Sequence, residues 1–496
     1  MQLIDWILVV VPILLVLGVA TYTKRYVKSV ADFLAAGRCA RRYLLANARG
    51  ESDSGLANTI KGFEIILVSG FVVSFWEKIS IPVMLLIGIS GFVIFRFRET
   101  RALTLAQFFE IRYSRRFRLF MGTLCFISGI LNYGVFPAIS ARFFIYFLAL
   151  PNSVSVAGIE LSTMALLMAS YLICTLYLVI AGGQVTAMVT DCLEGILSHA
   201  IYIVIAISVF FVVNWSQVVH VMAAAAPGHS AIDPFDAKDV QNFNIWFVLM
   251  TLVNYAYTRM ALQNKQGFNA AAKSPHESRM GDVLGNWRMY ARTLMILLLG
   301  VCALTYLKHP DFIEQSGTMR AEISAIGDSY LRDQMSVPIA LRHLLPTGIK
   351  GLFCAMMIMG LFAGDSGHMH SWGSIFIQDV WMPITKRNIS PREHIWLLRG
   401  AVTFVALFAF CFSMVFTQTQ YIALWWAVTS GVFTSAAGAA IIGGLYWKRG
   451  TAAGAWAGAL TGATISLAGI AASGTTWKHI VDVIEPAFGI DLPARF

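Results

Sequence analysis

Charged residues are scarce in this chain, and its cysteines follow no motif. Only 13% of the 496 residues are charged, 57% are hydrophobic, and the mean hydropathy is +0.67. Soluble domains carry about 25% charged residues, so the composition excludes that class and indicates an integral membrane protein. The seven cysteines form no CxxC motif and no paired spacing, which argues against a disulfide framework or a Cys-ligated metal site.

A net charge of +10 does not by itself indicate a nucleic-acid partner. In a membrane chain the positions of Lys and Arg relative to the spans carry the information, and basic runs at a membrane edge are explained by topology. We therefore expect a lipid bilayer as a partner, and no nucleic acid. The oligomeric state stays open.

The apolar segments are long enough to cross a bilayer many times. A hydrocarbon core of about 30 Å needs about 20 helical residues. The first segment lacks a small-residue cleavage site, so we expect a retained helix rather than a signal peptide. The sequence predicts about twelve spans, at 3–23, 55–75, 80–97, 118–148, 160–182, 185–213, 241–262, 289–307, 351–380, 396–416, 419–445 and 451–473.

The distribution of basic residues predicts the orientation of these spans. Most of the 37 Lys and Arg residues fall in the connections after every odd-numbered span, so these connections are expected on the cytoplasmic side. Both termini are then expected outside, in a multi-pass protein of the plasma (inner) membrane. The outer connections 214–240 and 308–350 are long enough for short helices or a lid.

The spans divide into two five-helix units of opposite topology, which is the arrangement of transporters with inverted repeats. The expected organisation is a leading helix with its connection, a first repeat, an outer loop, a second repeat that contains the outer loop 308–350, and a trailing helix with a tail. Their expected limits are 1–54, 55–213, 214–240, 241–445 and 446–496.

Five short motifs make this division specific. They are DFLAAGR (32–38), TLAQFFEIRY (104–113), GGQVTAMVTDCLEG (182–195), LLPTGIKGLF (344–353) and GLYWKRGTAAGAWAG (444–458). In residues, order and spacing they resemble the signatures of the sodium:solute symporter family. The resemblance implies an all-α membrane protein with the LeuT-type fold: a 5+5 inverted repeat with one leading and one trailing helix. The family carries sugars, sialic acids, proline, pantothenate, iodide and short carboxylates, so the resemblance implies a small-molecule solute as a partner.

In this fold the first helix of each repeat is unwound near the membrane midplane, where backbone carbonyls and helix ends bind the ligands. In the first repeat, GESDSGLANTIKGFE (50–64) has glycines that flank a polar centre with poor helix propensity, so we expect a break there. The counterpart NYAYTRM (254–260) contains neither Gly nor Pro. Whether it unwinds stays open.

The resemblance implies a sodium site between the broken helix and the ninth span. Its carbonyl donors would be Ser52, Gly55 and Gly360. The family's hydroxyl pair falls on Ala363 and Gly364, which have no side-chain oxygen. Losing two donors should weaken a site of neutral carbonyls, so a proton-coupled or cation-independent carrier on the same fold is the alternative.

Other oxygens lie beside these positions. Asp53 separates the two carbonyl donors of the broken helix, and Asp365 and Ser366 directly follow the altered pair. A second family site would use Asp191 with hydroxyls of the ninth span, where Ser366 matches one and Gly367 replaces the other. We expect a cation-binding region here, with Na⁺ or H⁺ as the coupling ion and no other cofactor.

Asp365 is the most informative of these residues. A carboxylate at the midplane costs about 2.5–3.5 kcal/mol on insertion scales unless it is paired or faces water. We expect Asp365 to be a ligand, a proton carrier or a partner for Lys61; the alternative is a structural ion pair. His368 lies one turn on and could hydrogen-bond Asp365. Lys61 could replace a mobile cation, or pair with Glu64 at i, i+3.

Candidate substrate contacts are polar or aromatic residues on spans that line the pathway in the family's fold, and interhelical packing is the alternative for the tyrosines. The mixture suits a sugar-like polyol or a carboxylate. We find no nucleophile–base–orienter set and no phosphate loop, so a secondary transporter is expected and not an enzyme. The candidates are Asn58, Thr59, Glu64, Asn132, Tyr133, Tyr255, Arg259, Tyr421, Trp425 and Trp426.

Overall fold

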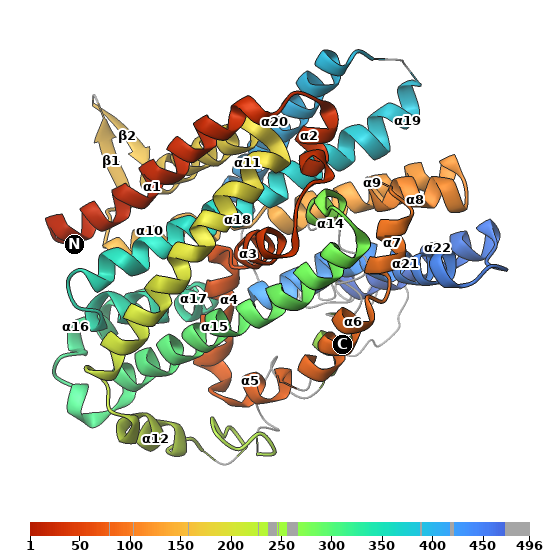
Figure 1. The fold of residues 1–496 in the computed structure, drawn as a ribbon. Helices are drawn as coiled ribbons and strands as arrows, with labels where there is room; N and C mark the ends of the chain where they lie inside the picture. The colour runs from red at the N-terminus through yellow and green to blue at the C-terminus, as the bar shows by residue number, and fades with distance from the viewer. Residues whose placement is uncertain are drawn as a thin grey trace, which may run out of the picture.

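The computed structural model describes residues 1–471 except 79, 103, 157, 227, 237–245, 247, 255–265, 387–388 and 417–420. In this part of the chain the protein is built of helices and one small β-hairpin (Figure 1). The hairpin joins β1 (Ser153–Val156) to β2 (Ile159–Ser162) in an antiparallel pair with Ser153 opposite Ser162.

The N-terminal half contains one leading helix, a broken helix and several long apolar helices. Their bounds are α1 (Leu3–Thr23), η1 (Lys24–Tyr26), α2 (Val30–Ala35), η2 (Ala36–Arg38), α3 (Arg42–Ser52), α4 (Leu56–Ser69), α5 (Val72–Glu77), α6 (Ser80–Ser90), α7 (Ile94–Glu99), α8 (Leu105–Arg112), α9 (Arg115–Tyr133), α10 (Phe136–Leu148), α11 (Thr163–Phe210) and α12 (Trp215–Ala223).

The C-terminal half is also helical. Its elements are α14 (Gln266–Ala271), α15 (Pro275–Lys308), η4 (Pro310–Phe312), α16 (Gly317–Ser324), α17 (Ser329–Leu344), α18 (Ile349–Ile375), the π-helical turn η5 (Phe376–Trp381), α19 (Met382–Thr385), α20 (Pro391–Val415), α21 (Ile422–Tyr446) and α22 (Ala452–Ala471). The connection 308–350, which was predicted to lie outside, contains short helices, and α17 packs against α10, α15 and α4.

Within the described residues, eight helical stretches are long and apolar enough to cross a membrane. One of them, α11, covers the two predicted spans 160–182 and 185–213. Gly182 and Gly183 have non-helical backbone angles and interrupt the helix between these two spans. Gly183 has φ 49°, and a Cβ at this position would lie 2.5 Å from the Phe33 carbonyl oxygen, so only glycine fits. Most of the predicted span 241–262 lies outside the described residues.

The helix α4 begins at Leu56, next to the predicted start of the second span at residue 55, but a further helix, α3, precedes it and was not predicted. Three ion pairs between α3 and α15 explain why hydropathy missed α3. The Nη2 of Arg42 lies 2.6 Å from Glu277. The other two pairs are Arg49–Asp282 and Arg288–Glu51, each at 2.7 Å. These pairs allow charged side chains to be buried between helices.

The core lies along α18. This helix packs against α11, α1 and α20, and Figure 1 shows α1, α11 and α18 running side by side. Nearly all side chains from Phe353 to Ile375 are buried. In contrast, α1 exposes large apolar side chains such as Leu3, Ile7 and Val11. An outer face of this kind suits contact with lipid.

Candidate functional site

The broken helix has its non-helical residues where the glycine-flanked segment predicts them. α3 ends at Ser52 and α4 begins at Leu56, with Gly55 in extended conformation at φ −44° and ψ 148°. The backbone carbonyl of Asp53 accepts a hydrogen bond from Asn58 Nδ2 at 3.1 Å and a second from the Arg292 guanidinium. The break therefore exposes backbone oxygen to side chains of α4 and α15.

The middle of α18 touches this break through glycines. A Cβ on Gly364 would lie 2.9 Å from Gly55 Cα and 3.8 Å from the Ser52 carbonyl oxygen. A Cβ on Gly360 would lie 2.9 Å from the Ser54 carbonyl oxygen. The structure thus brings Ser52, Gly55, Gly360 and Gly364 together, with backbone against backbone.

The polar residues that follow on α18 are buried. Ser366 donates its hydroxyl hydrogen to the Ala363 carbonyl oxygen at 3.2 Å. Asp365 is 3% exposed, and its Oδ2 accepts no hydrogen bond from the described residues. It lies within electrostatic range of Tyr133 and Tyr171. The carboxylate is thus inside the helix bundle and not on the lipid face.

Asp191 lies on α11, which packs along α18. The side chain is 1% exposed, and in the described structure neither carboxylate oxygen accepts a hydrogen bond. Three residues on, Glu194 is 0% exposed, and its two oxygens likewise accept none.

An aromatic cluster joins four helices near Asp365. His368 stacks on Tyr133 with ring centroids 5.4 Å apart and an interplanar angle of 13°. Its Nδ1 contacts the carbonyl oxygen of residue 364 at 2.8 Å. Phe136 stacks on Trp426 at 5.1 Å, and Lys61 Nζ lies 4.9 Å from the centre of a Trp426 ring. This cation–π contact brings α4 and α21 together.

Other predicted substrate residues contact neighbouring helices. Asn132 Nδ2 donates to Thr429 Oγ1 at 2.7 Å, so it ties α9 to α21. Trp425 packs on Phe416 with centroids 4.6 Å apart. Thr59 is 5% exposed within α4.

Glu64 and Tyr421 lie apart from the break. Glu64 Oε2 accepts a hydrogen bond from the Ile422 backbone N–H at 3.1 Å, and Tyr421 donates to Asp333 Oδ2 at 2.9 Å. Both hydrogen bonds connect helices around the start of α21. The two predicted residues Tyr255 and Arg259 lie outside the described residues.

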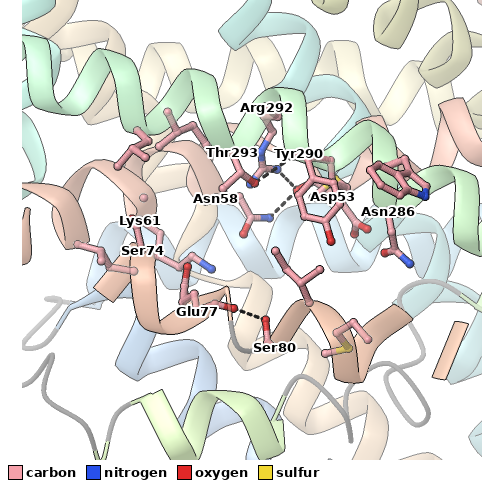
Figure 2. A pocket seen from close by; sticks show the side chains of 18 of the residues that line it. Asp53, Asn58, Lys61, Ser74, Glu77, Ser80, Asn286, Tyr290, Arg292 and Thr293 are labelled. Carbon is pink, nitrogen blue, oxygen red and sulfur yellow. Dashed lines mark hydrogen bonds between the residues drawn. The ribbon is translucent and has the colours of Figure 1, made fainter. Parts of the chain in front are cut away.

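A cavity of about 630 Å³ opens beside the break, between α4, α5–α6 and α15 (Figure 2). Its volume is within the range of about 300–1,000 Å³ that is typical of small-molecule sites. Apolar side chains of the same helices form much of the wall. The polar and charged lining consists of Asp53, Asn58, Lys61, Ser74, Glu77, Ser80, Asn286, Tyr290, Arg292 and Thr293.

Of the predicted site residues, Asp53, Asn58 and Lys61 line this cavity. Arg292 was not predicted, although a signal for it exists in the sequence. Arg288 and Arg292 are four residues apart, so they lie on one face of a helix, and both occur in the otherwise apolar segment of α15. Basic side chains on one face of a spanning helix are expected to point into the bundle.

Comparison with known proteins agrees with this architecture. The family model described as the sodium:solute symporter family matches residues 7–462. The chain is 22% identical to a sodium/glucose cotransporter of Vibrio parahaemolyticus over 94% of this chain and 85% of that protein. It is also 22% identical to a sodium/mannose cotransporter of Bos taurus, over 58% of this chain but only 50% of that longer protein.

A solved structure of a Na⁺-coupled sialic acid symporter in a substrate-bound outward-open state is similar over 99% of this chain and 93% of that chain. The TM-score is 0.74 at 15% sequence identity, so the likeness concerns the fold. The predicted fold class is confirmed.

The predicted secondary transporter is also confirmed, with sodium as the coupling ion of the family, and the proton-coupled or cation-independent alternative is not favoured. The protein is a multi-pass membrane transport protein. Because the family model spans all but the ends of the chain, the protein belongs to the sodium:solute symporter family.

Proposed function

We propose that the protein carries a small polar organic solute across the plasma (inner) membrane together with Na⁺, by alternating access around the break between α3 and α4. The observation that carries this proposal is the helix break beside the cavity, where the Asp53 carbonyl accepts hydrogen bonds from Asn58 and from Arg292 of α15. Unwound carbonyls at a helix break are the groups that such carriers use for ligands and ions.

The solute is proposed to be a sugar or a sugar acid. Amide and hydroxyl groups of Asn58, Ser74 and Asn286 supply hydrogen bonds for a polyol. Lys61 and Arg292 line the same cavity and would favour a carboxylate on it. The named relatives carry glucose, mannose or sialic acid, which belong to these two classes.

The aromatic cluster is proposed to close the inner side of the solute path. Tyr133, Trp425 and Trp426 would stack on the solute, with Asn132 and Thr59 as hydrogen-bonding neighbours. Lys61 links this cluster to the cavity because it lies over Trp426 and also lines the cavity.

Other predicted residues are proposed in further roles. Tyr255 and Arg259 stay candidates from the sequence, and Glu64 and Tyr421 are proposed to hold the outer helices around the path.

The cation is proposed to bind where α18 and α11 meet the break. The candidate oxygens are the carbonyls of Ser52, Gly55 and Gly360 and the side chains of Asp53, Asp365, Ser366 and Asp191. Ala363 and Gly364 contribute only backbone. His368 is proposed to position Asp365 through the shared contact with Tyr133.

The organisation expected from the sequence completes the proposal. Both termini would face outside. Residues 55–213 and 241–445 would form the two repeats, and α3 extends the first repeat towards the N-terminus.

Uptake by proteoliposomes tests the function. Purified protein is reconstituted and assayed with labelled glucose, sialic acid and proline under an inward Na⁺ gradient, and with Na⁺ replaced by choline. Saturable uptake of a sugar or a sugar acid that disappears in choline is expected. Equal uptake in both media would contradict sodium coupling, and uptake of proline alone would contradict the solute class.

A further inference from the structure

A second hollow, of about 520 Å³, lies where α3 and α15 begin. It shares no lining residue with the cavity beside the break. Three of its side chains are basic and one is acidic, so its wall carries a net positive charge. The lining consists of Arg41, Arg42, Tyr43, Lys273, Ser274 and Glu277.

A short backbone bridge joins the two sides of this hollow. Ala40 pairs with Ala272 in parallel: the Ala40 N–H donates to the Ala271 carbonyl oxygen at 3.0 Å, and the Lys273 N–H donates to the Ala40 carbonyl oxygen at 2.9 Å. Arg41 and Lys273 each directly follow a bridged alanine. Paired strands lie about 4.8 Å apart, so these two basic side chains begin close together.

The positive charge of the hollow is only partly compensated. Arg42 Nη2 lies 2.6 Å from Glu277 Oε1, and the Arg42 backbone N–H donates to Glu277 Oε2 at 2.7 Å. Arg41 and Lys273 are exposed, and neither side chain forms a hydrogen bond or an ion pair with another described residue. Two cations therefore face outwards from one hollow without a counterion from the described part of the chain.

Further arginines strengthen this positive region. The Arg98 guanidinium donates to the Ala272 carbonyl oxygen at 2.7 Å and fixes the bridge from the side of α7. Arg38 and Arg101 both lie within electrostatic range of Arg98, and Arg38 Nη2 donates to the Arg101 carbonyl oxygen at 3.0 Å. An anion in the hollow would thus be attracted by more than the two side chains that line it.

The length of α3 places the hollow at the surface of the bilayer. The break is expected near the membrane midplane. The 11 residues of α3 span about 16 Å, which is about half of a hydrocarbon core of about 30 Å. The apolar stretch Val72–Glu99 ends here and Pro275–Lys308 begins here. Tyr43 is 74% exposed, and exposed aromatic side chains beside basic ones are typical of a membrane interface.

We propose that this hollow binds the headgroup phosphate of an anionic phospholipid, with Arg41 and Lys273 as the phosphate contacts and Tyr43 beside the glycerol. Basic pockets between spanning helices on the cytoplasmic side bind anionic headgroups, and the basic residues predict this side to be cytoplasmic. The position at the bilayer surface favours a lipid over soluble phosphate. The proposal depends on neither the solute nor the coupling ion.

Thermal unfolding of the purified protein in a nonionic detergent tests the site. The unfolding temperature is measured against the concentration of dioctanoylphosphatidylglycerol, of dioctanoylphosphatidylcholine and of inorganic phosphate. The test variant is Arg41→Gln with Lys273→Gln. Arg116→Gln with Lys448→Gln is the matched control, because it removes one arginine and one lysine from exposed positions outside the hollow that are predicted on the same side.

Phosphatidylglycerol should stabilise the wild type and the control variant in a saturable manner, whereas phosphatidylcholine and phosphate should not. In the test variant the half-maximal concentration should rise about 30-fold, since each basic residue at an anionic surface contributes about fivefold. Lys273→Gln alone should raise it about fivefold, which keeps the proposal testable if the double variant does not fold. Lys273→Arg keeps the charge and should resemble the wild type.

Three results would overturn the site. An equal loss of affinity in the test and control variants would mean that the lipid follows the basic surface as a whole. Equal stabilisation by phosphatidylcholine would exclude recognition of headgroup charge. Saturable stabilisation by phosphate alone would assign the hollow to a soluble anion.

The proposed function fails or stands separately. An unchanged phosphatidylglycerol titration of the test variant, with Na⁺-dependent uptake intact in proteoliposomes, would overturn the lipid site alone. Uptake that persists in choline, with the lipid titrations as expected, would contradict sodium coupling alone.

Discussion

Replacing Gly364 with alanine tests the contact between α18 and the helix break. The added Cβ would lie 2.9 Å from Gly55 Cα and 3.7 Å from Gly55 N, and these backbone atoms cannot rotate away. Overpacking of a core costs about 1–3 kcal/mol. A Gly to Ala change inside a helix contributes about 0.5–1 kcal/mol of stability. The expected net loss is therefore roughly 0–2.5 kcal/mol.

Two helical glycines with open space around them supply the control. A Cβ at Gly400 in α20 or at Gly431 in α21 would meet nothing within 4 Å. Gly400→Ala and Gly431→Ala should thus gain only the stability that alanine adds to a helix. The free energy of unfolding of Gly364→Ala should therefore be about 1–3 kcal/mol lower than that of these two variants. Thermal unfolding in detergent measures the difference. Equal stability of all three variants would refute the close contact.

The same substitution has a second expected effect. If α18 contacts the break in only one conformation of the transport cycle, about 1–3 kcal/mol corresponds to a 5–150-fold shift between conformations. Gly364→Ala should then change the uptake rate far more than Gly400→Ala does. An unchanged rate would mean that the contact is the same in both conformations.

Three further substitutions test the ion pairs and the break. Arg49→Met leaves Asp282, which is 2% exposed, without its partner at 2.7 Å, so the free energy of unfolding should fall by about 3–5 kcal/mol, and Arg49→Met with Asp282→Leu should recover most of this loss. Arg292→Gln removes the guanidinium that donates to the Asp53 carbonyl, so the free energy of unfolding should fall by about 1–3 kcal/mol and uptake should be slower. Arg292→Lys should be intermediate in both measurements. No change in either measurement would contradict the role of Arg292 at the break. Asp365→Asn should abolish Na⁺-dependent uptake while the protein stays monodisperse in detergent, and unchanged uptake would remove Asp365 from the mechanism.

Hydropathy predicted the long apolar helices well. α1, α20 and α21 lie within a few residues of the predicted spans because their apolar runs are continuous. It failed for α3, whose charged side chains pair with residues more than two hundred positions later. A window of twenty residues cannot register such a partner.

Of the candidate site, only the features that depend on neighbouring residues in the sequence could be predicted. The break could be read from the sequence because Gly55 and the polar residues beside it disfavour helix locally. Gly360 was predicted as a carbonyl donor and Gly364 as a position that lacks the family's hydroxyl, yet their direct contact with the break depends on how two distant helices pack. Arg292 was not predicted because its hydrogen-bond partner is the backbone carbonyl oxygen of Asp53, which accepts a side-chain donor only where the helix is broken.

Binding of radioactive Na⁺ to the purified protein tests sodium coupling most directly, since it requires no knowledge of the solute. We predict saturable binding that unlabelled Na⁺ displaces and K⁺ does not. Absence of saturable binding, or equal displacement by K⁺, would contradict the assignment of Na⁺ as the coupling ion.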